Sequence, residues 1–179
     1  MDLLFQKFSD TEEELLVNWL TSEVWPFHGQ PQPEADEIRR ACQLGRYASS
    51  DSRTFWIIIN GQTRIGLIRL FDLQDQTPVF DIRLLRDYRG RGYGTQALQW
   101  LTDYVFTTWP QKRRIEGYTR QDNRGMRRVF LACGYLKEAH HRQAWPGQKN
   151  EYYDSIGYAI LRDDWMHGRQ TAVNWQDEL

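Results

Sequence analysis

The segment from Arg89 to Thr95 has the residue types that could hold a phosphate group. It reads RGRGYGT, with glycines at positions 90, 92 and 94. Glycine lets the main chain approach a ligand closely and adopt conformations that other residues avoid. An apolar run precedes the turn and a helical pattern follows it, so the free N–H groups of a helix N-terminus would face the bound anion. Arg89 and Arg91 add positive charge that suits phosphate.

The spacing of these glycines separates the known kinds of phosphate-binding turn. A nucleotide P-loop ends in Gly-Lys-Ser/Thr, whereas Gly94 is followed directly by Thr95. A dinucleotide fingerprint reads G-x-G-x-x-G, whereas this turn reads G-x-G-x-G. The remaining pattern is Arg89-x-x-Gly92-x-Gly94, which by itself fits both a phosphate site and a plain glycine-rich turn.

Residues that commonly bind metals show no matching pattern. The four histidines and the two cysteines, Cys42 and Cys133, lie outside the intervals of a zinc site. Unpaired cysteines of this kind are typical of small apolar core residues in a reducing compartment. The sequence therefore predicts no bound metal.

Signals along the chain place the turn in an alternation of strands and helices. Asn60-Gly61 between two apolar runs is a hairpin signal, and Ser9 with Glu12 forms a capping box before an apolar stripe. The expected strands are residues 3–8, 54–59, 64–71, 79–85, 114–119, 135–142 and 152–161. The expected helices begin after Ser9, at Pro33, near Thr95 and after Asn123. This order predicts an α/β fold with one parallel crossover in its second half.

Length and composition indicate one domain. The chain has 179 residues, 40% of them hydrophobic, which is enough for one core. Its 23 basic and 24 acidic side chains give a formal charge of −1, so no attraction to nucleic acid or membrane is expected. No apolar run approaches the ~18 residues of a spanning helix, and the acidic N-terminal segment is unlike a signal peptide. We expect a cytoplasmic protein with a domain over residues 1–165 and a tail over residues 166–179.

Three segments together resemble the GNAT superfamily of N-acetyltransferases. Arg89-x-x-Gly92-x-Gly94 is similar to its acyl-CoA pyrophosphate motif, and residues 123–135, with Asn123 and Gly134, resemble its second segment. Residues 154–165 resemble the end of the branch that contains ribosomal-protein N-terminal acetyltransferases. The resemblance implies a single-domain acyl-CoA N-acyltransferase fold of the α/β class, with a mixed, mostly antiparallel sheet and helices on both faces.

The resemblance also implies that acetyl-CoA is the co-substrate. By position, the residues that would bind it are Leu84, Leu85, Arg89, Gly90, Arg91, Gly92, Tyr93, Gly94, Thr95, Asn123 and Arg128. A bulge near Leu84 and Leu85 would free main-chain N–H groups for the pantetheine arm and for the thioester oxygen, where they would form an oxyanion hole. Asn123 can also be a simple helix cap, and Arg128 can also be solvated.

Acetyl transfer to an amine needs a base, because an ammonium group has no lone pair. Asp81, on the matching strand, is the first candidate and Asp154 is the second. An ion pair between Asp81 and Arg83 is the alternative role for Asp81. Many relatives have a tyrosine that protonates the leaving thiolate where this chain has Phe130. Either another hydroxyl, Tyr152 or Tyr153, or water is expected to replace it.

In the family the acceptor lies between an early helical loop and the last hairpin. The residues expected to contact it here are Trp25, Phe27, His28, Arg142 and Trp145. Together with Glu23, Asp81 and Asp154, these aromatic side chains suit a cationic amine. The aromatic residues can equally cover the core. Peptide N-termini, polyamines and sugar amines all remain open as acceptors.

Two functions fit these features. The first is an N-acetyltransferase that moves acetyl from acetyl-CoA to the primary amine of a small molecule or a peptide N-terminus, by direct attack through a tetrahedral intermediate. The second is a non-catalytic acyl-CoA-binding module of the same fold. The expected partner is the amine substrate. By analogy with such folds, a homodimer is also possible.

Overall fold

A computed structural model describes residues 3–147 and 150–175. Its strands are β1 (Leu4–Lys7), β2 (Arg53–Ile59), β3 (Thr63–Phe71), β4 (Val79–Leu84), β5 (Arg114–Arg120), β6 (Leu136–Pro146) and β7 (Tyr152–Leu161). Its helices are α1 (Glu13–Thr21), α2 (Ala35–Gln43), α3 (Tyr93–Thr108), α4 (Arg124–Ala132) and α5 (Arg162–His167). Single 3₁₀ turns precede α1, at Asp10–Glu12, and α3, at Arg86–Tyr88. The structure does not describe residues 1–2, 148–149 and 176–179. In the sequence-based prediction these are the start of the domain, the loop of the last hairpin and the end of the tail.

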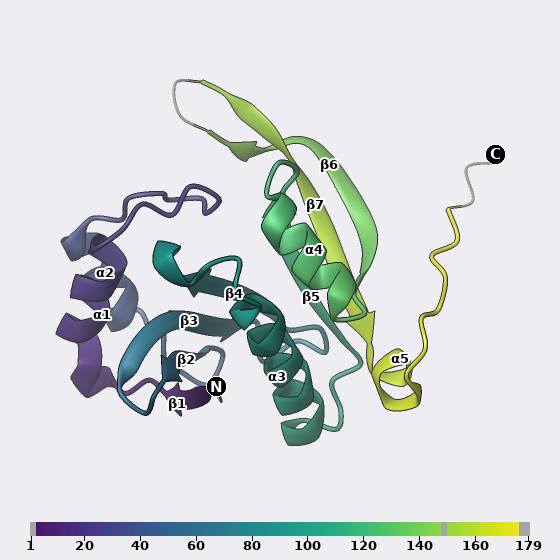
Figure 1. The fold of residues 1–179 in the computed structure, drawn as a ribbon, viewed down its shortest axis with the longest axis horizontal. Helices are drawn as coiled ribbons and strands as arrows, with labels where there is room; N and C mark the ends of the chain where they lie inside the picture. Colours follow the sequence, from purple (N-terminus) through teal and green to yellow (C-terminus); the bar gives the residue numbers. More distant parts are fainter. Residues whose placement is uncertain (1–2, 148–149, 176–179) are drawn as a thin grey trace.

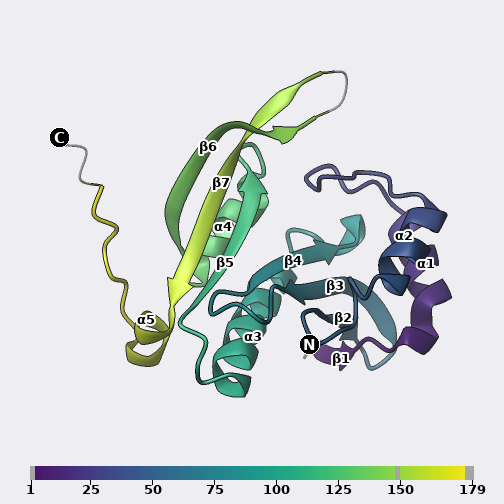
Figure 2. The same ribbon diagram turned by 180° about the vertical axis from the view of Figure 1, so that it is seen from behind.

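The strands form one mixed sheet with the order β1-β2-β3-β4-β5-β7-β6 (Figure 1). The β4–β5 pair is parallel and the other neighbouring pairs are antiparallel. Helices α3 and α4 lie against one face of the sheet, while α1 and α2 cover the part of the other face formed by the first strands (Figures 1 and 2). The predicted α/β fold, with a mostly antiparallel sheet and helices on both faces, is confirmed.

Each layer of helices has its own apolar core. On one face Leu98 and Leu101 of α3 and Phe130 of α4 pack against the sheet. On the other face Leu16 of α1 and Ile38 of α2 pack against it. The strand between these cores, β2, is buried from its second residue to its last and is almost continuously apolar. A strand covered on both faces needs such a run rather than an alternating pattern.

The sheet opens between β4 and β5. Their ladder is reduced to one pair, Val79 with Glu116, in the described chain. Beyond this pair the two strands diverge (Figure 1). The opening lies at the carboxyl end of β4, directly before the glycine-rich turn, so the main chain of β4 is left without a neighbour on that edge.

Several element boundaries differ from the sequence-based expectation, and strand β6 extends to Pro146 instead of residue 142. Helix α2 begins at Ala35 instead of Pro33, because Glu34 and Glu37 form a capping box. Helix α3 begins at Tyr93 instead of near Thr95, because Gly92 takes the left-handed conformation and acts as its N-cap. Helix α5 crosses the boundary expected after residue 165. The chain after α5 folds back, with Thr171 donating to Asp164.

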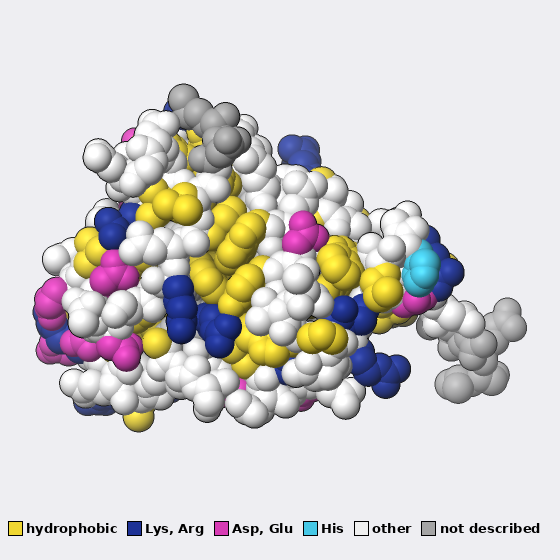
Figure 3. All heavy atoms as spheres, turned by 90° about the horizontal axis from the view of Figure 1, so that it is seen from below, with side chains coloured by type: hydrophobic (Ala, Val, Ile, Leu, Met, Phe, Trp, Pro, Cys, Tyr) yellow, Lys and Arg dark blue, Asp and Glu magenta, His cyan; other side chains and the backbone are white. Residues whose placement is uncertain are grey.

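One face of the molecule shows how the surface charges are distributed (Figure 3). Apolar side chains gather in the middle of this face, and Lys or Arg and Asp or Glu side chains are interspersed around them. A near-neutral chain is expected to have such a mixture. Within the described residues, no helix is both long enough and apolar enough to cross a membrane.

Gly66 permits the close approach of β3 and β4, and its replacement tests that packing. A Cβ atom there would lie 2.6 Å from the carbonyl oxygen of Arg83 and 2.6 Å from a methyl carbon of Leu84. Gly66→Ala is therefore expected to lower the free energy of unfolding by about 1–3 kcal/mol. Urea unfolding measures the change. Gly29→Ala is the control, because nothing lies within 4 Å of its Cβ position, and an equal loss in both variants would contradict the packing argument.

Candidate active site

A cavity of about 600 Å³ lies in front of the glycine-rich turn. Its lining includes eight residues expected from the sequence to bind the co-substrate, which are Leu84, Arg89, Gly90, Gly92, Gly94, Thr95, Asn123 and Arg128. The opposite wall is the loop between α1 and α2, with Trp25, Phe27 and His28. Among the described residues, the expected Leu85, Arg91 and Tyr93 are outside this lining. We refer to this space as the turn cavity.

The main chain at the start of α3 offers hydrogen-bond donors to the turn cavity. The N–H of Gln96 donates to the carbonyl of Gly92 at 3.1 Å, which is the first bond of the helix. The N–H groups of Tyr93, Gly94 and Thr95 precede that bond, so they have no carbonyl within the helix. With the helix dipole of the 16-residue α3 behind them, these donors form a site suited to an anion.

The arginines around the turn cavity differ in how they are held. Arg89 is already engaged, because its Nε donates to the carbonyl of Leu84 at 2.7 Å and its Nη2 pairs with Glu23 at 3.0 Å. Arg124 and Arg128 lie one turn apart on α4 and line the cavity, and the described residues provide neither with an ion pair. Their charges are therefore available to a phosphorylated ligand. The sequence reasoning missed Arg124. The signal that could have identified it is its position four residues before Arg128, which places both side chains on one face of the helix.

Asn123 has the role of a helix cap. Its Oδ1 accepts from the N–H of Met126 at 3.2 Å, and its Nδ2 donates to Thr119 at 3.0 Å. The alternative considered for this residue, an N-cap, is thereby confirmed. Because Asn123 also lines the turn cavity, the cap fixes one wall of the site.

The β4 main chain differs from the sequence-based expectation. No bulge is present in its pairing with β3, whose register is continuous from Gly66 with Leu84 to Phe71 with Val79. The N–H of Leu85 donates to the carbonyl of Ile65 at 2.9 Å and is not free. Since successive N–H groups of a strand point to opposite edges, those of Ile82 and Leu84 point into the opening toward β5. Ile82 therefore replaces Leu85 as the second free donor.

A second cavity, of about 280 Å³, adjoins the turn cavity on the β4 side. The two share Phe27, His28, Ile82, Asn123 and Met126. The second cavity also contains Asp81, Arg83, Arg69 and Trp145. We call it the acceptor cavity. The half-buried side chain of Met126 packs against the core and also lines both cavities.

Asp81 is held by two partners in the acceptor cavity. Its Oδ2 accepts from Nε of Arg83 at 3.0 Å, and its Oδ1 lies 2.9 Å from Nε2 of His28. The Asp81 and His28 side chains are each 21% exposed. The ion pair with Arg83, the alternative considered from sequence, is confirmed. His28, which was assigned only to acceptor contact, forms a second pair that brings the α1–α2 loop onto β4.

These partners set the charge of the Asp81 carboxyl group. Burial by itself raises the pKa, but the positive charges of Arg83 and His28, the hydrogen bond from His28 and the charge of Arg69 outweigh it. The pKa of Asp81 therefore lies well below its ordinary value of 3.8. An anion with such a low pKa is a weak proton acceptor, so Asp81 can orient a neighbour more readily than act as the base.

The lowered pKa predicts acid sensitivity that depends on Asp81. Its contribution to stability is complete above the ordinary value of 3.8 and is lost as the pH falls from there toward the folded pKa. Wild type and Asp81→Asn should differ by on the order of 2 kcal/mol in free energy of unfolding near neutral pH. That difference should shrink below about pH 4. Denaturant titrations over this range measure it, and a difference independent of pH would contradict the expectation.

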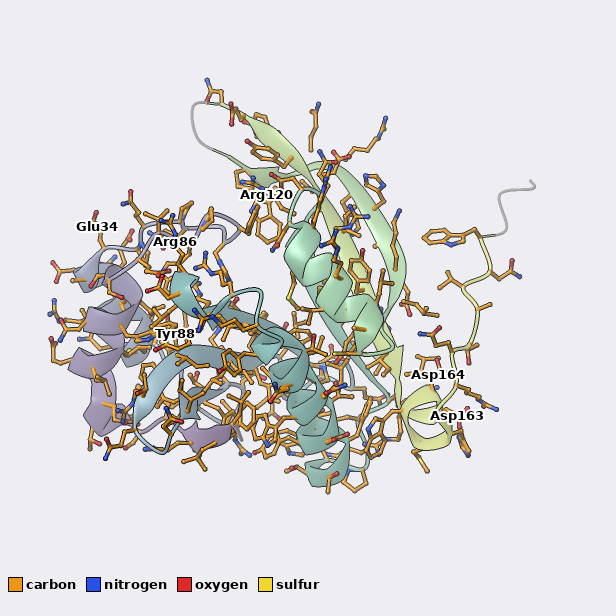
Figure 4. All side chains as sticks on the ribbon, viewed as in Figure 1. Glu34, Arg86, Tyr88, Arg120, Asp163 and Asp164 are labelled. Atoms are coloured by element: carbon orange, nitrogen blue, oxygen red, sulfur yellow. The ribbon has the colours of Figure 1, made fainter. Side chains whose placement is uncertain are left out.

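The loop that carries His28 is attached at a second point. Arg120, at the end of β5 and labelled in Figure 4, donates to the carbonyl of Pro26 at 3.2 Å. Its guanidinium lies 5.1 Å from the Phe27 ring centroid. It also lies 3.7 Å from the Tyr153 ring centroid. The sequence reasoning missed this contact, because 94 positions separate the two residues.

Four of the expected site residues lie elsewhere or have another role. Tyr152 is 61% exposed, Arg142 is exposed, and neither lines either cavity. Asp154 is held outside both cavities by Nε2 of His140 at 2.7 Å and the N–H of Gln143 at 2.9 Å. Trp25 lines the turn cavity, but it is 1% exposed and donates to Leu20 at 2.8 Å, so it is largely a core residue.

A tyrosine other than those expected reaches the acceptor cavity. Phe130 is buried and stacks on Tyr158, with 4.5 Å between ring centroids. Tyr118 of β5 lines the acceptor cavity, and its hydroxyl donates to Glu116 at 3.3 Å. Burial and then the charge of Glu116 raise the pKa of Tyr118. Its hydroxyl therefore stays protonated near neutral pH and can donate a proton. Tyr153 instead donates to Glu151 and, among the described residues, is absent from the linings of both cavities.

The described residues contain no group of three or more His, Cys, Asp or Glu side chains that could hold a metal ion.

Comparison with known families agrees with this geometry. Residues 2–136 match the family described as "Acetyltransferase (GNAT) domain". The chain belongs to the GNAT acetyltransferase family. The matched region includes the glycine-rich turn, α3, α4 and both ends of the His28–Asp81 pair. No curated protein matches the sequence significantly.

Solved structures with this GNAT fold include spermidine N-acetyltransferases of Vibrio cholerae. A chimera of that enzyme with hSSAT is 19% identical, with a TM-score of 0.80 over 93% of this chain and 99% of the other. The enzyme in complex with CoA and spermine is 17% identical, with a TM-score of 0.79 over 92% and 98%. A dodecameric form is 17% identical, with a TM-score of 0.76 over 93% and 97%. At these identities the similarity shows the fold.

Proposed function

We propose that this GNAT protein transfers the acetyl group of acetyl-CoA to a primary amine by direct attack of the amine. The observation that carries the proposal is the junction of two cavities at His28, Ile82 and Asn123. One cavity has the anion-binding start of α3, and the other has a paired histidine and carboxylate. A ligand in each would bring its reacting group to this junction, where proximity accelerates the reaction.

The turn cavity fits acetyl-CoA, which supplies an activated acetyl thioester when bound. The N–H groups of Gly94 and Thr95 would bind its pyrophosphate, with the charges of Arg124 and Arg128 beside it. The N–H groups of Ile82 and Leu84 would bind the pantetheine arm and stabilise negative charge on the thioester oxygen. The CoA complex of a protein with the same fold supports this use of the cavity.

His28 would take up the proton of the acceptor ammonium, directly or through water. Its Nε2 is bonded to the ionised Asp81, which leaves the lone pair on Nδ1, an atom without a hydrogen-bond partner among the described residues. Because Nδ1 is buried, the loop that carries His28 would have to shift to expose it to the acceptor. Asp81 would stabilise the positive imidazole and hold its orientation. Tyr118 lines the same cavity, and its hydroxyl, once released from Glu116, is the protein group that would return a proton to the leaving thiolate.

The acceptor cavity suits a compact amine. Its volume of about 280 Å³ lies at the lower end of small-molecule sites. The spermine complex of a protein with this fold makes polyamines the first class to test. Because residues 154–165 resemble the ribosomal-protein branch, peptide N-termini are the second class of acceptor to test.

Calorimetric titration with acetyl-CoA, followed by thiol release with a panel of amines, tests the proposal. Saturable binding together with turnover of one amine class is the expected result. Binding without turnover of any amine would contradict catalysis and favour the acyl-CoA-binding module instead. Absence of binding would contradict the assignment of the turn cavity.

A further inference from the structure

Arg69 on β3 is a half-buried cation without a counter-ion in the described chain. Its guanidinium carbon lies 4.7 Å from the ring centroid of Phe71 and 5.6 Å from that of Tyr47. Its Nε is buried and has no hydrogen-bond partner among the described residues, which also provide no ion pair for this side chain. The terminal nitrogens of its guanidinium group are not among the buried atoms without a partner, and Arg69 lines the acceptor cavity, so they can meet a ligand there. This arrangement suggests that an anion from outside the chain binds at Arg69.

The carboxylates near Arg69 are already occupied. Asp81, its partner in the β3–β4 register, is bonded to Arg83 and His28. Glu37, on α2, accepts from the side chain of Gln30 and from the N–H of Glu34. Neither is within ion-pair distance of Arg69 in the described structure. No carboxylate is therefore left to form a direct ion pair with Arg69, and Asp81 offsets its charge only from a distance.

Further positive charge lies on the far side of Arg69. Arg69 and Arg83 form the wall between the acceptor cavity and a third cavity of about 310 Å³. That third cavity is also lined by Arg40 and Arg46, for which the described residues provide no ion pair. Four arginines thus face a space that contains one carboxylate, Glu37. The potential in this part of the site is positive and would repel a polycation.

We infer that the acceptor amine carries an anionic group, a carboxylate or a phosphate, which pairs with Arg69 while its amine lies near His28. The inference rests on the proposed acetyl transfer and specifies its substrate class. It differs from what the spermidine N-acetyltransferases of the same fold suggest, because a polyamine has no anionic group to offer Arg69. Arginine binds carboxylate and phosphate through two parallel hydrogen bonds.

The register of the sheet limits the distance between the two charged groups of the acceptor. Arg69 and Asp81 are opposite each other on neighbouring strands, so their Cα atoms are separated by about 5.5 Å. His28 is directly bonded to Asp81. A compact acceptor, such as an α-amino acid, a short ω-amino acid or a small aminoalkyl phosphate, can therefore reach both sites.

The first test compares acceptors that carry different charges, with each amino acid matched to its own amide. Amino acids of increasing chain length, their neutral amides, 2-aminoethyl phosphate and spermidine are assayed by thiol release at fixed acetyl-CoA. We expect kcat/KM for at least one anionic amine to exceed that of its neutral counterpart by about 10- to 100-fold. Whichever of the carboxylate and phosphate acceptors has the higher kcat/KM identifies the anionic group. Equal or faster turnover of the amide or of spermidine would overturn the inference and leave acetyl transfer intact.

The second test removes the charge of Arg69. Arg69→Gln should raise KM for the anionic acceptor by about 10- to 100-fold, with a much smaller change for its amide, and Arg69→Lys should recover part of the loss. Arg39→Gln is the control, because it removes a charge from α2 that is paired at the surface with Glu14 and Asp36. Unchanged acetyl-CoA affinity in each variant verifies folding. An equal loss for both acceptors in Arg69→Gln would overturn the inference, whereas no turnover of any acceptor by the wild type would overturn acetyl transfer itself.

Discussion

Replacing Gly92 with tryptophan is expected to weaken acetyl-CoA binding by at least about 100-fold, equivalent to ~2.7 kcal/mol. Gly92 is the N-cap of α3 and lines the turn cavity. Its Cβ position has one neighbour within 4 Å, the Gln96 amide at 4.0 Å, so the chain has room for a side chain there. An indole group would fill the space in front of the free N–H groups of α3. Calorimetric titration of the purified variant measures the loss.

The control for this variant must reproduce its backbone strain. Gly61, in the β2–β3 turn, has φ +70° compared with +84° for Gly92, and nothing lies within 4 Å of its Cβ position. Gly61→Trp should therefore incur a similar conformational cost of about 1–3 kcal/mol and still bind acetyl-CoA normally. Normal binding by Gly92→Trp would show that the pyrophosphate is bound elsewhere. Equal loss in both variants would attribute the effect to folding.

Replacing His28 with glutamine should lower kcat by about 100- to 1,000-fold, the range for removal of a general base. Glutamine can still donate a hydrogen bond to Asp81, but its amide cannot accept a proton near neutral pH. Because the N–H groups of α3 are unaffected, acetyl-CoA affinity should change little. Steady-state thiol release measures kcat, and calorimetric titration measures the affinity.

The chain contains a second histidine–aspartate pair that serves as a control. Nε2 of His140 lies 2.7 Å from Asp154 on the β6–β7 hairpin, and His140 is 44% exposed. His140→Gln removes the same type of contact outside both cavities and should retain full kcat. If His140→Gln lost activity and His28→Gln did not, the base would belong to the hairpin, and Asp154 would regain the role that its sequence position suggested.

The elements that carry the turn cavity could be predicted from the sequence because their signals are local. Asn60-Gly61 specifies a hairpin within four residues, and both residues have the positive φ that such a turn requires. Gly90 and Gly92 also have positive φ, as expected of a turn built from glycine. The cap at Asn123 likewise depends only on the next helical turn.

The acceptor side could not be predicted because its contacts connect distant segments. His28 meets Asp81 through the path of the loop between α1 and α2, which the pattern of apolar residues does not specify. The carboxylate of Asp154 is bonded to a histidine of the same hairpin, His140, and is not free for the site. Whether Leu85 or Ile82 has a free N–H group depends on which edge of β4 pairs with β3. A shift of the register by one residue would reverse that edge.

The opening between β4 and β5 has a consequence for how this protein can change over evolutionary time. The donors assigned to the thioester are main-chain N–H groups of Ile82 and Leu84, which no substitution other than proline removes. The acceptor side, by contrast, is made of side chains such as Asp81, Arg69 and Trp145. Mutations can therefore alter which amine is acetylated while the contacts to the acetyl donor persist. Descendants of one ancestral protein can in this way diversify in substrate without first losing their chemistry.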